Sequence, residues 1–186
     1  MKNILYINAC CRENSRTNEL AQYLLGGFEG NVQSVNLYEE SIRPIDATLL
    51  SKRDGLLREG RTDSEMFTLA NQFALADTVV IAAPYWDLMF PSVLKVYLEN
   101  ITVCGITFRY SDKGIPQSLC KAEKLYYVTT AGGYIGKNNF GFDYVKAIAE
   151  GFFGIGNVSL FSAEGLDIYG ADVDGIMQKA KEKILF

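Results

Sequence analysis

The chain has 186 residues, of which 48% are hydrophobic and 22% charged, and its formal net charge is −4. This length and composition predict one globular domain over residues 1–186. A nucleic-acid-binding protein would usually carry a basic stripe, which this mildly acidic chain lacks, and no apolar run reaches the roughly 18 residues that a membrane span needs. We therefore expect a soluble, cytoplasmic protein that binds neither nucleic acid nor a membrane.

The residue types that are missing narrow the possible chemistry. The chain has no histidine, which excludes Ser-His-Asp and Cys-His catalysis and removes the commonest metal ligand. Its four cysteines, at positions 10, 11, 104 and 120, form no Cys-x-x-Cys pair. We expect neither a metal site nor a disulfide framework.

Strand-like and helical segments alternate from the first residues onward. Residues 2–8 are largely apolar and predict a buried strand, a polar turn follows, and residues 17–25 have helical spacing that ends at Gly26-Gly27. The alternating pattern of residues 32–37 predicts a second strand. Residues 38–62 are polar and mixed, with room for a short helix.

The second half of the chain continues this alternation. Thr62-Asp63-Ser64-Glu65 is typical of a capping box and predicts the start of an amphipathic helix that continues to Ala76. Residues 78–83 are continuously apolar, as in a strand buried on both faces, and Pro91 fits the first turn of the next helix. The remaining pattern predicts a helix at 92–102, a strand at 124–130, a helix at 144–153, a strand at 158–162 and a helix at 171–185.

This order of elements predicts an α/β fold. Its doubly wound sheet would contain five parallel strands in the flavodoxin-like order 2-1-3-4-5. The carboxyl ends of parallel strands meet at one edge of the sheet, where such folds bind ligands. The loops after the first, third and fourth strands, residues 9–18, 84–91 and 129–139, are therefore expected to be neighbours.

The first of these loops has the residues of an anion site. Hydroxyls and two arginines, Arg12 and Arg16, precede a helix N-terminus, where free amides and the helix dipole favour a phosphate. Because no glycine occurs before Gly26, the loop is neither a dinucleotide fingerprint nor a Walker loop, and a terminal monophosphate fits it better. The alternative is that Ser15 or Thr17 only caps the helix.

The other two loops suit a flat ring with polar edges. Residues 84–91 contain the only tryptophan, Trp86, with two further aromatic residues, which can stack on an aromatic ligand or pack against a helix or a second subunit. Gly132 and Gly133 in the third loop allow close backbone approach and leave amides for ligand carbonyls. A phosphate site, an aromatic surface and an amide-rich loop together predict a pocket for flavin mononucleotide (FMN).

With these motifs the chain resembles the flavodoxin-like FMN-dependent NAD(P)H:quinone reductases and NADH-azoreductases. The family pattern Ser-Pro-Arg…Ser-x-Ser-x-x-Leu corresponds to residues 10–20, and Ala-Pro followed by Pro-x-x-Leu-Lys corresponds to residues 83–95. The azoreductase-type run Gly-x-Thr-Phe-Arg-Tyr is present at residues 105–110, and the Gly-Gly loop at residues 129–133. The matches follow the family's order over most of the domain.

Two departures from the family pattern stand out. Cys10 and Cys11 replace the usual Ser-Pro, and Asp87 replaces an asparagine that is frequent in azoreductases. A carboxylate beside a reduced, anionic flavin would be unfavourable, so Asp87 is expected to point away or to be paired.

The resemblance implies where FMN would bind. Its phosphate would lie on Ser15, Arg16 and Thr17. The isoalloxazine would lie along the second loop, and its pyrimidine end would meet the third loop. The residues that would contact the ring system are Pro84, Tyr85, Trp86, Asp87, Leu88, Thr129, Thr130, Ala131, Gly132 and Gly133.

The resemblance also implies a ping-pong reaction and a homodimer. NADH or NADPH would deliver hydride to flavin N5 and leave, and a quinone or azo compound would then receive two electrons, so no catalytic side chain is required. The partner subunit would complete each site. Four aromatic residues would suit such an interface, although each could also pack in the core: Phe90, Phe108, Tyr110 and Phe140.

Two other functions remain open. Cys10 and Arg16-Thr17 match the Cys-x5-Arg-[Ser/Thr] signature of low-molecular-weight tyrosine phosphatases, in which a thiolate attacks the phosphate. Against a phosphatase, the loop contains Glu13, which would repel a phosphate, and no Asp-Pro pair follows near the C-terminus. The second alternative is a flavodoxin-type electron carrier, for which a net charge of −4 is small.

Overall fold

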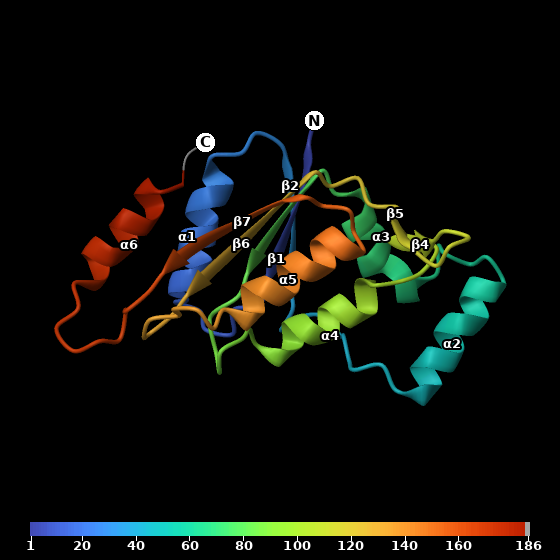
Figure 1. Cartoon of the computed structure of the whole chain (residues 1–186), viewed down its shortest axis with the longest axis horizontal. Helices are drawn as coiled ribbons and strands as arrows, with labels where there is room; N and C mark the ends of the chain where they lie inside the picture. Colours follow the sequence, from blue (N-terminus) through green and yellow to red (C-terminus); the bar gives the residue numbers. More distant parts are fainter. Residues whose placement is uncertain (185–186) are drawn as a thin grey trace.

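Five parallel strands form the centre of the computed structural model, which describes residues 1–184 (Figure 1). Their order across the sheet is β2-β1-β3-β6-β7, in which β2 is an edge strand and β1 lies between β2 and β3. This confirms the expected doubly wound order 2-1-3-4-5. The strand bounds are β1 Asn3–Asn8, β2 Asn31–Asn36, β3 Thr78–Ala82, β6 Lys124–Thr130 and β7 Asn157–Ala163.

The register of the strands brings their carboxyl ends together. Asn8 at the end of β1 is level with Ala82 at the end of β3, and Thr130 at the end of β6 is level with Ala163 at the end of β7. All five residues of β3 are buried, as expected for a central strand of continuous apolar sequence. The loops that follow these strands therefore share one edge.

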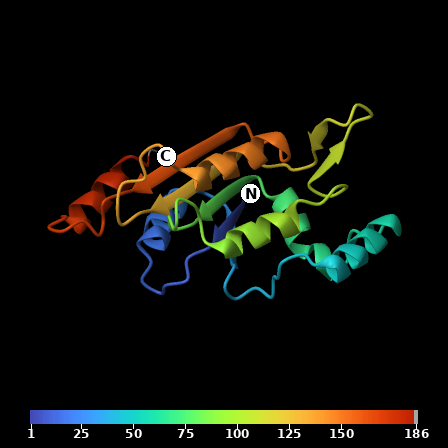
Figure 2. The ribbon, with the colours of Figure 1, turned by 60° about the horizontal axis from the view of Figure 1, so that its bottom comes forward.

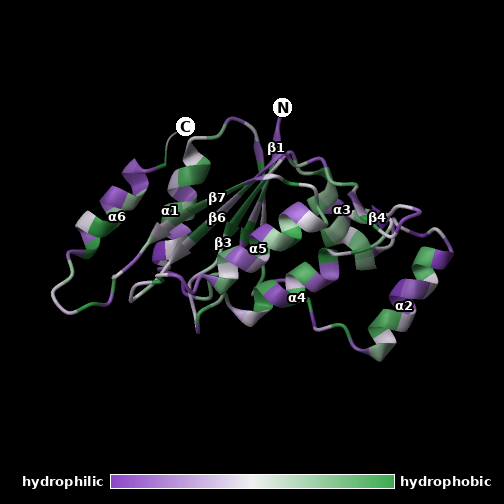
Figure 3. Cartoon of the chain, in the orientation of Figure 1, coloured by the Kyte–Doolittle hydropathy of each residue, from purple (hydrophilic) through white to green (hydrophobic). Residues whose placement is uncertain are grey.

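Helices cover both faces of the sheet (Figures 1 and 2). Helices α1 (Arg16–Gly26) and α6 (Val173–Glu182) pack on the face to which Ile4 and Tyr6 of β1 point. The alternate residues Leu5 and Ile7 point to the other face. That face is covered by α3 (Thr68–Leu75), α4 (Ser92–Ile101) and α5 (Phe140–Gly151). Figure 3 shows the hydrophobic residues concentrated in the strands between these two layers.

Several helix boundaries differ from the sequence prediction. Helix α5 begins four residues early because the Asn139 side chain accepts a hydrogen bond from the amide of Phe142. The hydroxyl of Ser64, not of Thr62, caps the short 3₁₀ helix Glu65–Phe67 that leads into α3, and Pro91 is the N-cap of α4 and so precedes its first turn. The last helix was predicted over residues 171–185 but runs from Val173, after its Asp172 N-cap, to Glu182, where Lys183 is the C-cap. Leu185 itself lies outside the described residues.

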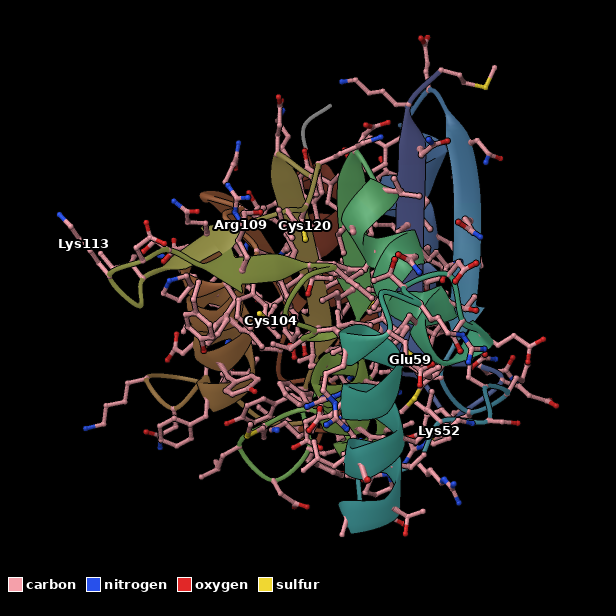
Figure 4. The ribbon with its side chains drawn as sticks, turned by 90° about the vertical axis from the view of Figure 1, so that its right-hand side faces the viewer. Lys52, Glu59, Cys104, Arg109, Lys113 and Cys120 are labelled. Atoms are coloured by element: carbon pink, nitrogen blue, oxygen red, sulfur yellow. The ribbon has the colours of Figure 1, made fainter. Side chains whose placement is uncertain are left out.

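Two elements extend from the body of the sheet at the end opposite α6. The short helix left open for residues 38–62 is α2 (Ala47–Arg58), of which only Leu56 is buried. The sequence did not predict the hairpin of β4 (Phe108–Tyr110) and β5 (Pro116–Ser118). Figure 4 shows Lys113 at the outer tip of this hairpin. Within residues 1–184, no helix is both long and apolar enough to cross a membrane.

Candidate functional site

A cavity of about 280 Å³ lies at the carboxyl edge of the sheet, where the loops after β1, β3, β6 and β7 meet. The three loops singled out in the sequence are neighbours here, as predicted. Nine of the predicted site residues line the cavity: Ser15, Arg16, Thr17, Pro84, Tyr85, Trp86, Thr130, Ala131 and Gly132. The others that line it are Cys10, Cys11, Arg12, Asn14, Leu166 and Asp167.

The start of α1 forms the polar wall of the cavity. The Ser15 hydroxyl accepts a hydrogen bond from the amide of Asn18 at 3.2 Å and so caps the helix. The same side chain also hydrogen-bonds to the Cys10 thiol. The amides of Arg16 and Thr17, in the first turn, have no partner within the helix. Free amides and the positive end of the helix dipole make this wall favourable to an anion.

The Thr17 hydroxyl is already engaged within the protein. It lies 2.6 Å from the Thr130 hydroxyl, and both residues are buried. This bond joins the start of α1 to the end of β6 and holds the first and third loops in place. Thr17 thus helps to position the cavity wall, and the direct contact with phosphate that the resemblance implies stays a prediction.

Two arginines supply the positive charge of the site. The Arg16 guanidinium lies 2.9 Å from the Asp167 carboxylate, and the exposed fractions of the two side chains are 41% and 71%. Within residues 1–184, no carboxylate pairs with Arg12, which also lines the cavity. Exposed ion pairs are weak, so both guanidinium groups can turn toward an anion.

The second loop is a tight two-residue turn. Trp86 and Met89 exchange two backbone hydrogen bonds of 2.8 Å, and the residues between them have φ angles of 51° for Asp87 and 66° for Leu88. These angles belong to the left-handed region that disfavours side chains other than glycine, asparagine and aspartate. Asp87 and Leu88 stand at the tip of the turn and do not line the cavity, although the sequence placed both in contact with the isoalloxazine.

The strain at Leu88 leads to a stability prediction. We expect Leu88→Gly to raise the free energy of unfolding by about 0.5–1 kcal/mol, because relief of the left-handed backbone exceeds the entropic cost of glycine. The matched control is Leu50→Gly, because Leu50 is similarly exposed but lies inside helix α2, where glycine costs about 1 kcal/mol. Urea unfolding measures both, and equal losses of stability would contradict the prediction.

The third loop brings bare backbone to the cavity. The amides of Gly132 and Gly133 donate no hydrogen bond to another group within residues 1–184, which leaves them available to ligand carbonyls. Gly133 is exposed just beyond the cavity. Thr129 is buried and points away from the cavity because side chains alternate along β6. The Tyr85 hydroxyl donates to the Asn138 carbonyl at 2.9 Å and so ties the second loop to the third.

A fourth loop, after β7, completes the cavity and was missed in the sequence. Leu166 and Asp167 line it, and their amides donate to the carbonyls of Ala131 and Gly132 at 3.2 and 2.9 Å. The sequence could have indicated this loop by its position. Because β7 was correctly predicted as the last parallel strand, the loop after it had to lie at the same edge of the sheet.

The environment of Cys10 does not suit a nucleophile. Its thiol is buried beside the Ala82 carbonyl, and this burial raises the pKa of the Cys10 thiol to about 11. The group is therefore protonated at neutral pH, whereas a phosphatase needs a thiolate. The Cys-x5-Arg pattern is present, but burial of the Cys10 thiol disfavours the thiolate that a phosphatase requires.

Two of the four aromatic residues expected at a subunit interface are core residues. The Phe90 and Tyr144 rings pack edge to face, and so do the Phe108 and Phe152 rings. The side chains of Phe90 and Phe108 are each 5% exposed. Tyr110 and Phe140 are about half exposed, at 54% and 53%. An interface role for Phe90 and Phe108 required exposed rings, but Tyr144 of α5 packs against Phe90 and Phe152, just after α5, packs against Phe108.

Comparison with known proteins identifies relatives over the whole domain. A family model described as a flavodoxin-like fold matches residues 2–185. An FMN-dependent NADH:quinone oxidoreductase of Lachnoclostridium phytofermentans is 34% identical, over 98% of this chain and 96% of that protein. A second such protein, from Clostridium acetobutylicum, is 33% identical with the same shares covered. The structure of an azoreductase from Bacillus anthracis superposes with a TM-score of 0.84 at 24% identity, over 99% of this chain and 97% of that chain, and this likeness concerns the fold.

Proposed function

Since this chain belongs to the flavodoxin-like family that includes the FMN-dependent NADH:quinone oxidoreductases, we propose that it binds FMN and transfers electrons from NADH to a quinone or an azo compound. The observation that carries the proposal is the cavity itself. Side by side it holds an anion site at the start of α1, an exposed tryptophan, and glycine amides without partners. Four other pockets, on the strand ends and beside helices α2 and α4, do not combine these features.

The residues of the cavity fit FMN group by group. Arg12, Arg16 and the first amides of α1 would hold the phosphate, with the Ser15 hydroxyl as a further donor. Trp86, 39% exposed, offers a flat surface for the isoalloxazine. The amides of Gly132 and Gly133 would donate to its pyrimidine carbonyls.

The bound cofactor would supply two-electron hydride chemistry, so the protein's task is binding and orientation. The second and third loops are fixed to each other through Tyr85 and Asn138, which sets the spacing between the aromatic and the amide walls. An open cavity with one aromatic wall suits a ping-pong order, in which the nicotinamide leaves before the acceptor enters. NADH as the donor is supported by the names of the two curated relatives, and an NADH-dependent reaction is consistent with a cytoplasmic enzyme.

The experiment that tests this function is spectroscopic. The protein is purified without added cofactor, reconstituted with FMN, and treated with NADH and then with a quinone under anaerobic conditions. We expect a flavin spectrum that NADH bleaches and the quinone restores, followed by continuous NADH oxidation when both substrates are present. Failure to bind FMN would refute the proposal. Binding without NADH turnover would instead support an electron carrier.

A conservative variant separates the reductase from the phosphatase. We expect Cys10→Ser to retain FMN content and quinone reduction within about twofold, because the buried thiol donates to the Ala82 carbonyl and interacts with Ser15, and a serine hydroxyl can make the same hydrogen bonds. A phosphatase would lose its nucleophile and all activity. Loss of flavin or of quinone reduction in Cys10→Ser would show that the thiol has a role in the reaction.

We propose that the functional unit is a homodimer. The support is the pair of half-exposed aromatic rings, Tyr110 on the protruding hairpin and Phe140 at the start of α5. Aromatic residues are enriched at subunit interfaces. Phe140 directly follows the third loop, so a partner bound there would lie close to the cavity.

A further inference from the structure

A carboxylate lies inside the part of the cavity where the phosphate would bind. Asp167 lines the cavity together with Arg16 and Ser15, and its Oδ1 is 2.9 Å from Arg16 Nη1. The same guanidinium nitrogen also donates to the Leu166 carbonyl at 3.5 Å. In this structure Arg16, one of the three residues expected to contact the phosphate, is bound to a competing anion.

The fold places Asp167 firmly against the third loop. Its amide donates to the Gly132 carbonyl at 2.9 Å. A Cβ atom on Gly132 would lie only 2.3 Å from Asp167 Oδ2, so the carboxylate occupies space that exists because residue 132 is a glycine. The backbone of Asp167 is thus fixed, whereas its side chain is 71% exposed and can rotate away from Arg16.

The charges of the cavity indicate the consequence. Arg12 and Arg16 contribute two positive charges and Asp167 one negative charge, and within residues 1–184 no other charged side chain lines the cavity. A phosphate monoester that carries nearly two negative charges would meet a net charge of only +1. It would also have to displace Asp167 from Arg16 or remain close to it, and either alternative weakens binding.

We propose that Asp167 is a specificity-determining residue that competes with the cofactor phosphate for Arg16 and so weakens FMN binding without affecting the flavin ring. The inference rests on the proposed function. Riboflavin has the same ring system as FMN but no phosphate, so Asp167 should affect the binding of FMN and not that of riboflavin. Asp167 would thus reduce the preference of the site for FMN over riboflavin.

The test compares Asp167→Asn with the unmodified protein. The dissociation constants of FMN and of riboflavin are measured by calorimetry on the full chain freed of flavin. We expect Asp167→Asn to bind FMN about three- to tenfold more tightly, with riboflavin affinity unchanged, and the gain to shrink at high ionic strength. Asp174→Asn is the matched control, since it removes an exposed carboxylate of α6 outside the cavity and should leave both constants unchanged.

A second comparison tests whether Asp167 acts through Arg16. We expect Arg16→Gln to weaken FMN binding more in the Asp167→Asn background than in the unmodified protein, because Arg16 is then no longer shared. Unchanged or weaker FMN binding by Asp167→Asn, or an equal gain for riboflavin, would overturn the inference. If the unmodified protein binds neither FMN nor riboflavin measurably, the proposed function fails, and the inference fails with it.

Discussion

Gly154→Ala is expected to lower the free energy of unfolding by about 3 kcal/mol, a large share of the stability of a domain of this size. Gly154 has a φ of 66°, a left-handed conformation that costs any other residue about 1–2 kcal/mol. A Cβ atom there would lie 2.6 Å from Cβ of Ser118 and 3.1 Å from its hydroxyl oxygen. The Ser118 hydroxyl donates to the Phe153 carbonyl and accepts from the Cys120 amide, so the clash disrupts the contact that anchors the hairpin to the end of α5.

The matched control for Gly154 is Gly151, three residues earlier. Gly151 is the last residue of α5, has ordinary backbone angles, and would place a Cβ in open space. Gly151→Ala should therefore leave stability unchanged or raise it slightly, since alanine favours a helix. Urea unfolding followed by circular dichroism measures both variants. A similar midpoint for the two would show that the backbone at 154 can relax, contrary to the prediction.

Trp86→Ala is expected to weaken the binding of FMN and of riboflavin by about tenfold or more, and to the same degree. The ring system is common to both flavins, and stacking on an aromatic side chain contributes on the order of 1–3 kcal/mol. Trp86 is 39% exposed and its backbone bonds to Met89 do not involve the side chain, so folding should be unaffected. Flavin titration by calorimetry, with thermal unfolding of the same samples, checks both expectations.

Two further variants make the interpretation of Trp86 specific. Trp86→Phe retains a flat ring and should recover most of the affinity. Tyr169→Ala removes a fully exposed aromatic side chain outside the cavity and should change neither flavin constant. A loss confined to FMN in Trp86→Ala would contradict a stacking role, because only the phosphate distinguishes the two ligands. The pattern expected for Trp86→Ala thus differs from that expected for Asp167→Asn.

The candidate site shows which contacts are local in the sequence and which are not. Ser15 as the cap of α1 is a contact over three residues, and the sequence pattern of hydroxyls before a helix indicated it. The bond between Thr17 and Thr130 joins residues 113 positions apart, and the ion pair between Arg16 and Asp167 joins residues 151 positions apart. No local pattern reports such pairs, because they depend on the register of separate strands.

By itself, the sequence determined the layered α/β architecture, the strand order and the edge at which the loops gather. Hydrophobic periodicity carries this information, since each segment must bury its apolar face and parallel strands end together. Only the tertiary structure decided which side chains face the cavity. It turned Thr129 inward, left Asp87 at the tip of a strained turn, buried Phe90 and Phe108, and placed Asp167 beside Arg16. These outcomes depend on packing between distant segments, where a difference of one residue in register reverses the direction of a side chain.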